Sequence, residues 1–135
     1  MKLSSLWRAP KRASLGGAPE VSPQEFKRWL DENRLLQIVD ARTGLEYHQG
    51  TITGALHAPV TGMPDSLTRL SLDRSIPVVV LCLSGHRSLP EARWLRDNGY
   101  EAYSLHGGLL AWKHAGYSLS SASTTPPRST DRVTG

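Results

Sequence analysis

The sequence has a single cysteine, Cys82, among its 135 residues, so no internal disulfide can form. This absence excludes a secreted scaffold held together by disulfides and fits a reducing compartment better. It also excludes a dithiol redox centre or a metal site built from several cysteines. No window approaches the roughly 18 to 20 uninterrupted apolar residues of a membrane span. We therefore expect a soluble protein that has no membrane partner, with the cytoplasm as its location.

Basic and acidic residues nearly balance over most of the chain. The net charge of +4 comes largely from residues 1–19, which contain Lys2, Arg8, Lys11 and Arg12 but no acidic residue. Residues 20–117 contain ten basic and eleven acidic residues and are therefore nearly neutral. A basic face of the kind that follows phosphates is not indicated, so we expect no nucleic-acid partner.

The length and composition predict one domain, spanning residues 20–117, with a tail at each end. Residues 1–19 are interpreted as a flexible basic tail, because they lack the apolar stretch of a secretory signal. Their basic, serine-containing composition also suits a mitochondrial transit peptide, which makes the mitochondrial matrix the alternative location. Residues 118–135 are rich in Ser, Thr and Pro and are interpreted as a disordered tail.

Helix signals and apolar runs alternate along residues 20–117. Strands are expected at Leu35–Val39, Pro77–Leu81 and Tyr100–Leu105, with a weaker one within Ile52–Pro59. Helices are expected at Pro23–Asn33, after Thr43, around Pro64–Leu70, after Ser88 and at Leu109–Ala115. Capping boxes are predicted for three of these helices, formed by Ser22 with Glu25, Thr43 with Glu46 and Ser88 with Glu91. Such alternation predicts an α/β fold with a mostly parallel sheet of about five strands and helices on both faces.

Cys82 follows the strongest strand and precedes a short loop and a helix. In parallel α/β sheets, ligands bind beyond the carboxyl ends of the strands, and Cys82 lies at such an end. A short loop that closes around the sulfur can direct its backbone N–H groups at it, and Gly85 supplies the freedom that a tight arc requires. These N–H groups, the helix dipole and Arg87 are expected to stabilise Cys82 as a thiolate nucleophile.

Four motifs, in order, resemble the single-domain rhodanese family of sulfurtransferases, over roughly residues 21–119. They are Asp40-Ala-Arg42, Gly50-Thr-Ile-Thr-Gly-Ala-Leu-His57-Ala-Pro59, Cys82-Leu-Ser-Gly-His-Arg87-Ser88, and Gly107-Gly108-Leu-Leu-Ala-Trp112 with Ala115-Gly116-Tyr117. Two residues depart from the family pattern: Thr51 stands where His is usual, and His57 stands where Asn is common.

The resemblance implies a rhodanese-like fold and a persulfide-forming Cys82 that takes sulfane sulfur from a donor such as thiosulfate. The acceptor would be cyanide or a thiol, either a low-molecular-weight thiol or a protein. Residues of the loop would bind the substrates: Leu83, Ser84, Gly85, His86, Arg87 and Ser88. No metal or organic cofactor is needed for this exchange, and either a monomer or a homodimer is compatible with it.

The length of the loop separates two chemistries. Cys82 and Arg87 are spaced as Cys-x4-Arg, which resembles the sulfurtransferases, whereas the related phosphatases and arsenate reductases use Cys-x5-Arg. The shorter loop suits one sulfur atom better than a tetrahedral oxyanion. A phosphatase or arsenate reductase is therefore the weaker alternative, and a sulfur-relay or interaction module, loaded by a partner enzyme, is another.

Asp40 and Arg42 are expected to be structural, because an ion pair at a strand end can brace neighbouring loops.

Overall fold

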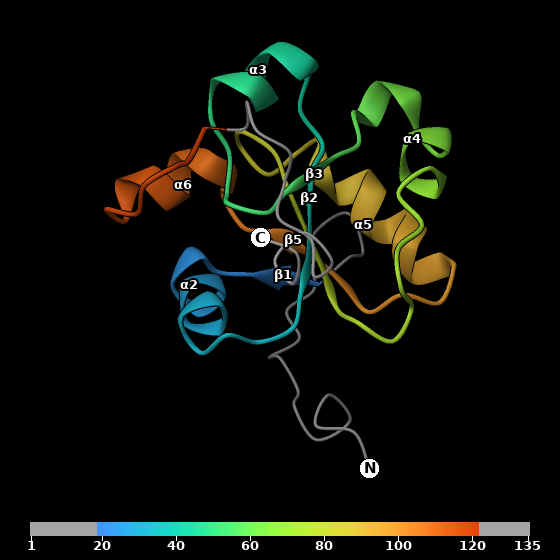
Figure 1. Ribbon diagram of the computed structural model, residues 1–135, viewed down its shortest axis with the longest axis horizontal. Helices are drawn as coiled ribbons and strands as arrows, with labels where there is room; N and C mark the ends of the chain where they lie inside the picture. Colours follow the sequence, from blue (N-terminus) through green and yellow to red (C-terminus); the bar gives the residue numbers. More distant parts are fainter. Residues whose placement is uncertain (1–18, 122–135) are drawn as a thin grey trace, which may run out of the picture.

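The computed structural model describes residues 19–121. Five parallel strands form one sheet in the order β1-β5-β4-β2-β3, with helices on both of its faces (Figure 1). The predicted α/β class and the parallel sheet are therefore confirmed. No helix of residues 19–121 is long and apolar enough to cross a membrane.

The strands are short, and the helices are one to three turns long. The strands are β1 (Glu20–Val21), β2 (Gln37–Asp40), β3 (Leu56–His57), β4 (Val78–Leu81) and β5 (Ala102–Leu105). The helices are α2 (Pro23–Asp31), α3 (Gly44–Gln49), α4 (Asp65–Thr68), α5 (Ser88–Asp97) and α6 (Gly108–His114), with a 3-10 turn, η1 (Val60–Gly62). The predicted elements are present, but most are shorter than expected, and the Ile52–Pro59 segment forms only the two-residue strand β3.

Apolar side chains pack on both faces of the sheet. Phe26 and Trp29 of α2 and Trp112 of α6 lie in the cluster on one face. Leu67 of α4 and Leu95 of α5 lie in the cluster on the other face. Central strand β4 is buried along its whole length, as its run of valines predicts. Both faces of the sheet are therefore covered, and a binding site is expected at the carboxyl ends of its strands.

The folded domain extends beyond the predicted boundary at residue 117. Ser120 pairs with Thr51 in an isolated antiparallel bridge, through backbone hydrogen bonds of 2.8 and 2.7 Å. Leu119 packs against the apolar cluster formed with α2 and α6. Residues 118–120, which composition assigns to a disordered tail, are thus ordered here because their backbone and a leucine find partners. The remainder of both predicted tails, residues 1–18 and 122–135, lies outside the described residues.

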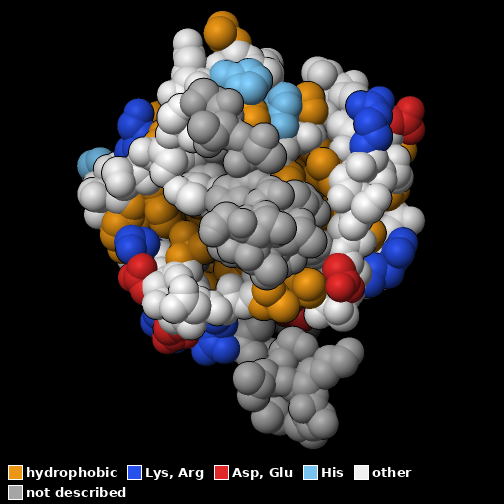
Figure 2. Space-filling model, viewed as in Figure 1, with side chains coloured by type: hydrophobic (Ala, Val, Ile, Leu, Met, Phe, Trp, Pro, Cys, Tyr) orange, Lys and Arg blue, Asp and Glu red, His pale blue; other side chains and the backbone are white. Residues whose placement is uncertain are grey.

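Charged side chains of both signs are interspersed over the face of the molecule drawn in Figure 2. Lys and Arg lie beside Asp and Glu in small groups among the described residues of this face. The surface seen from this side is therefore electrostatically mixed, in keeping with the near balance of charges in residues 20–117.

Candidate functional site

Cys82 is the first residue after β4, and strand geometry decides which way its side chain points. Val79 and Leu81 belong to the apolar cluster with α2 and α6, whereas Val78, Val80 and Cys82 belong to the cluster with α4 and α5. This is the two-residue alternation of a β-strand, continued one residue past its end. It directs Cys82 toward the start of α5, where its side chain is completely buried.

Two groups contact the Cys82 sulfur. The backbone N–H of Gly85 donates a hydrogen bond to Sγ over 3.1 Å, and Oγ of Ser88 lies 3.5 Å from Sγ. Gly85 has a φ of +97°, and a Cβ at this position would come within 3.1 Å of the Gly107 nitrogen. The Gly85 N–H therefore reaches the sulfur because this residue adopts a backbone conformation that favours glycine.

The beginning of α6 holds the other side of the loop. The N–H of Leu109 donates to the Cys82 carbonyl at 2.8 Å, and the N–H of Leu110 donates to the Leu83 carbonyl at 2.9 Å. Gly108 has a φ of +64°, and a Cβ there would overlap the Leu83 carbonyl oxygen. The Gly107-Gly108 motif thus permits a close approach between the start of α6 and the loop, where two backbone N–H groups of α6 hold the carbonyls of Cys82 and Leu83.

Ser88 does not cap α5, contrary to the predicted capping box. The cap position is Arg87, which makes no side-chain cap, and Ser88 is already the first helical residue. Its hydroxyl is buried between the Cys82 sulfur and Oγ of Ser104 on β5, which is 2.7 Å away. A chain of two hydroxyls therefore leads from the sheet to the sulfur. Sequence reasoning missed Ser104, whose only signal is a hydroxyl residue in an otherwise apolar strand.

Glu91, the other half of the expected capping box, is completely buried, and neither of its carboxyl oxygens has a hydrogen-bond partner. Burial, with a smaller contribution from the negative charge of Asp40, raises the pKa of Glu91 to about 8. Glu91 is therefore mostly protonated near neutral pH. The capping box fails because the first turn of α5 faces the sheet rather than solvent.

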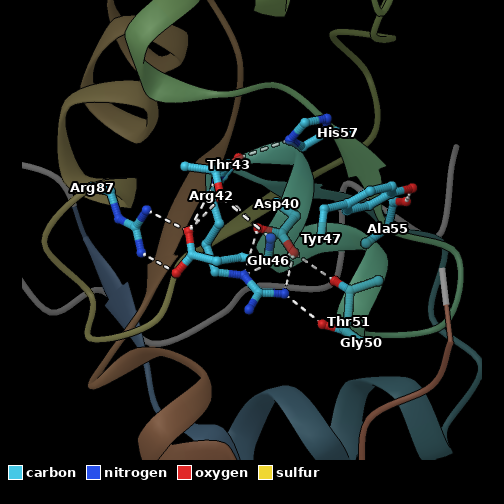
Figure 3. Close-up of polar contacts among 10 residues, drawn as sticks. All are labelled: Asp40, Arg42, Thr43, Glu46, Tyr47, Gly50, Thr51, Ala55, His57 and Arg87. Atoms are coloured by element: carbon cyan, nitrogen blue, oxygen red, sulfur yellow. Dashed lines mark hydrogen bonds and ion pairs between the residues drawn. The ribbon is translucent and has the colours of Figure 1, made fainter.

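At the rim of the loop, Arg87 pairs with Glu46 of α3 (Figure 3). Nη1 and Nη2 of Arg87 donate to Oε1 and Oε2 of Glu46 at 2.7 and 2.9 Å. The hydrogen bonds from Arg87 hold the pKa of Glu46 down at about 2, and Glu46 raises the pKa of Arg87. Both groups are therefore ionised at physiological pH, and the guanidinium fork that was expected to bind a donor anion is occupied by a carboxylate.

The loop after β2 is braced by a buried ion pair (Figure 3). Nη2 of Arg42 lies 2.9 Å from Oδ2 of Asp40 and donates to the Gly50 carbonyl at 2.5 Å. Thr51 donates to the same Asp40 oxygen at 2.7 Å. The structural role predicted for Asp40 and Arg42 is confirmed. Thr51, which departs from the family pattern, completes the hydrogen bonding of the carboxylate.

His57, the second departure, lies farther along this segment. Its Nε2 is 2.7 Å from the Arg42 carbonyl oxygen, and its ring stacks on Tyr47 with centroids 4.5 Å apart. Neither contact reaches the Cys82 loop, so this departure falls outside the immediate surroundings of the sulfur.

Leu83, Ser84 and His86 form the exposed part of the loop. Oγ of Ser84 lies 3.0 Å from Nδ1 of His86, so these two polar side chains contact each other at the surface. The residues predicted for the site are thus arranged in two layers. Cys82, Gly85 and Ser88 meet at the buried sulfur, whereas the other predicted residues lie around it at the surface.

The surroundings of Cys82 suit chemistry on sulfur. Among residues 19–121, no group of three or more His, Cys, Asp or Glu side chains is placed to hold a metal ion. The backbone N–H of Gly85 donates to Sγ, and the thiol of Cys82 donates to the Ser88 hydroxyl oxygen. Once the thiol has lost its proton, the same hydroxyl can turn to donate, so both groups can stabilise negative charge on sulfur.

Comparison with known proteins agrees with this geometry. The model of the rhodanese-like domain matches residues 22–115. A sulfurtransferase from Allochromatium vinosum is 33% identical over 98 residues, which cover 72% of this chain and 90% of that protein. The thiosulfate sulfurtransferase GlpE of Stutzerimonas stutzeri is 37% identical over 78 residues, which cover 57% of this chain and 70% of that protein.

A solved structure is similar over most of the domain. The rhodanese-like domain protein of Staphylococcus aureus superposes with a TM-score of 0.63 and 28% identity, covering 81% of this chain and 98% of that one. The family model spans well over half of the chain, and the two sequence relatives are named sulfurtransferases. The chain therefore belongs to the rhodanese-like domain family of sulfurtransferases.

Proposed function

We propose that this protein is a sulfurtransferase that moves sulfane sulfur from a donor such as thiosulfate to a nucleophilic acceptor through a persulfide on Cys82. The observation that carries the proposal is the surroundings of Sγ. The N–H of Gly85 and the hydroxyl of Ser88 both reach the one cysteine of the chain, at the end of the central strand.

The reaction would proceed by two exchanges at sulfur. In the first, the Cys82 thiolate attacks the outer sulfur of thiosulfate, a new S–S bond forms, and the S–S bond of the donor breaks to release sulfite. In the second, cyanide or a thiolate attacks the outer sulfur of the persulfide, and Cys82 leaves as a thiolate. Neither step requires an external oxidant or reductant, a metal or an organic cofactor, and negative charge stays on sulfur throughout.

The persulfide is an anion like the thiolate, so the same donors can serve both states. The Gly85 N–H and the Ser88 hydroxyl would interact with the negative charge as it moves outward by one bond. The Cys-x4-Arg spacing supports a cradle for sulfur rather than for a tetrahedral phosphate or arsenate, because the short loop encloses a small volume. We therefore favour sulfur transfer over the oxyanion chemistry of the related phosphatases.

Intact-mass measurement after incubation with thiosulfate tests the proposal. We expect the protein to gain the mass of one sulfur atom, to lose it on addition of cyanide with release of thiocyanate, and to gain nothing after Cys82→Ser. Loading of Cys82 by a partner enzyme but not by thiosulfate would indicate the relay module instead. Hydrolysis of an aryl phosphate that Cys82→Ser abolishes would indicate a phosphatase and would contradict the proposal.

A further inference from the structure

The entrance to the Cys82 loop contains a fixed negative charge that sulfur transfer by itself does not require. Glu46 of α3 and Arg87 of the loop have partly exposed side chains, with 27% and 34% of their surfaces accessible. Arg87 ends the loop that closes on the buried sulfur and interacts electrostatically with Cys82, so the pair lies at the solvent-exposed edge of this loop. Both oxygens of the Glu46 carboxylate are used on the Arg87 guanidinium.

Glu46 is held from two sides. The backbone N–H and the hydroxyl of Thr43 each donate to Oε1 of Glu46 at 3.1 Å, as part of the capping box that begins α3. An incoming anion that displaced Glu46 from Arg87 would have to overcome a charged, bidentate hydrogen-bonded pair. It would also disturb the cap of α3. The carboxylate is therefore a built part of the entrance and not a side chain that swings freely.

The guanidinium groups of Arg87 and Arg42 each have a carboxylate partner. Arg87 is paired with Glu46, and Arg42 is paired with Asp40 in the buried network behind it. A doubly charged donor such as thiosulfate would therefore be repelled by the Glu46 carboxylate. It would find no free guanidinium at Arg87 or Arg42 with which to pair. A singly charged donor experiences half of that repulsion, because Coulomb energy is proportional to charge.

We propose that Glu46 determines which donors this site accepts, by occupying the Arg87 fork and selecting against dianionic donors in favour of donors with at most one negative charge. The inference rests on the proposed function and deepens it, since it names the charge class of the preferred sulfur donor: thiosulfate, a dianion, would load Cys82 more slowly than a donor with one negative charge. Alkyl and aryl thiosulfonates and persulfides are donors of this class. Glu46 is a specificity-determining residue in this scheme, and it takes no part in bond making or breaking.

Glu46→Gln is the variant that tests the proposal. Glutamine keeps the length of the side chain and one oxygen for Thr43 and Arg87, so the cap of α3 can persist while the negative charge is lost. Glu25→Gln is the matched control. Glu25 also stands in the first turn of a helix and pairs with an arginine, Arg28, three residues farther along the same helix. It lies on α2, at the opposite end of the molecule from α3 in Figure 1.

Rates of persulfide formation should be compared for thiosulfate and for a monoanionic aryl thiosulfonate. We expect Glu46→Gln to raise kcat/KM about tenfold for thiosulfate and about threefold for the thiosulfonate, because the effect on the logarithm of the rate scales with donor charge. Most of the change should be in KM. Glu25→Gln should leave both values unchanged. Equal changes for both donors, or a loss with both, would overturn the proposal and make Glu46 a structural support of the loop.

A second readout does not depend on sulfur transfer. Cys82 is the only cysteine, so alkylation reports on this site alone. Glu46→Gln should speed alkylation by the anion iodoacetate about threefold and leave the rate with neutral iodoacetamide unchanged. If no small donor ever loads Cys82 but the alkylation ratio changes as expected, the proposed function fails and the charge selection stands. An unchanged ratio overturns the charge selection itself.

Discussion

Two glutamates stand in the first turns of the helices on either side of the Cys82 loop, and they behave in opposite ways. Glu46 of α3 is partly exposed, accepts hydrogen bonds from Thr43 and Arg87, and has a pKa lowered to about 2. Glu91 of α5 is completely buried, has no hydrogen-bond partner, and has a pKa raised to about 8. A glutamate in the first turn of a helix is therefore a fixed charge at the entrance in one case and a mostly protonated acid in the interior in the other.

The difference arises from what each helix turn faces. The first turn of α3 lies at the surface, where solvent and a loop arginine are within reach of the carboxylate. The first turn of α5 packs on the sheet, where a carboxylate loses its hydration and receives nothing in return. The outer edge of the loop thus carries a charged, paired carboxylate, whereas the hydroxyls of Ser88 and Ser104 lie on the inner side of the sulfur. Glu91, one turn along α5, is buried and mostly protonated.

The largest expected effect concerns the buried acid and the free energy of unfolding. Because the pKa of Glu91 is about 8 in the folded protein and ordinarily 4.5, its contribution to stability is fully present below pH 4.5 and is lost as pH rises toward 8. Glu91→Met, which fills a similar volume, should stabilise the protein by a few kcal/mol at pH 8 and by much less at pH 4.5. Urea unfolding at both pH values measures this.

Glu91→Gln is the control for charge against packing. Glutamine does not ionise, so it should also flatten the dependence of stability on pH between 5 and 8, while it still places an unpaired polar group in the interior. If the free energy of unfolding of the wild-type protein does not fall over this pH range, the Glu91 carboxylate must be stabilised in the folded protein by hydrogen-bond partners. The contrast between the two glutamates would then be lost.

The second prediction concerns the charged pair of Glu46 and Arg87 at the exposed edge of the site. Arg87→Ala leaves the Glu46 carboxylate without its partner and removes the one guanidinium of the loop. We expect persulfide formation from thiosulfate to slow by a factor on the order of thirty, because the Glu46 carboxylate would then repel the dianionic donor without a compensating positive charge beside it. Release of sulfur to cyanide, which carries one charge, should slow less. Single-turnover measurement of the two half-reactions checks this, and an equal loss in both would show that the charge of the Glu46–Arg87 pair does not act on the donor.

The third prediction distinguishes Ser88 from Thr43, which the sequence alike predicts to be helix-capping residues. Ser88→Ala should lower the rate of Cys82 alkylation by iodoacetamide at neutral pH about tenfold, because a hydroxyl that can donate to the thiolate is lost. Thr43→Ala should leave that rate nearly unchanged but destabilise the protein by about 1 kcal/mol, because it removes a helix cap. The reverse pattern would show that Ser88 is the cap and that the hydroxyl does not serve the sulfur.

The smallest effect is expected at Ser104, which reaches the sulfur only through Ser88. Ser104→Ala should lower the alkylation rate about threefold, because the Ser88 hydroxyl loses one polarising neighbour. The double variant with Ser88→Ala should then be no slower than Ser88→Ala alone. An additive loss would mean that Ser104 acts on Cys82 by a separate route.

Much of the fold was predictable because its signals are local. The valines of β4, the cap residues Thr43 and Glu46, and Gly50 at the end of α3 each act through near neighbours in the chain, and each is found in the expected role. The prediction failed at Ser88 and Glu91, where a good local capping pattern gives way to packing against the sheet. It also ended the domain at residue 117, because the pairing of Ser120 with Thr51 joins residues far apart in the sequence.

The sequence by itself determined the fold class, the place of Cys82 at the end of the central strand and the length of the loop that follows it. These properties depend on strand and turn preferences and on spacing along the chain. Only the tertiary structure decided that Ser104 stands behind Ser88, that Glu46 occupies the fork of Arg87 and that Glu91 is buried alone. Those outcomes depend on which distant elements meet around the sulfur, and on how much water each polar group loses when they do.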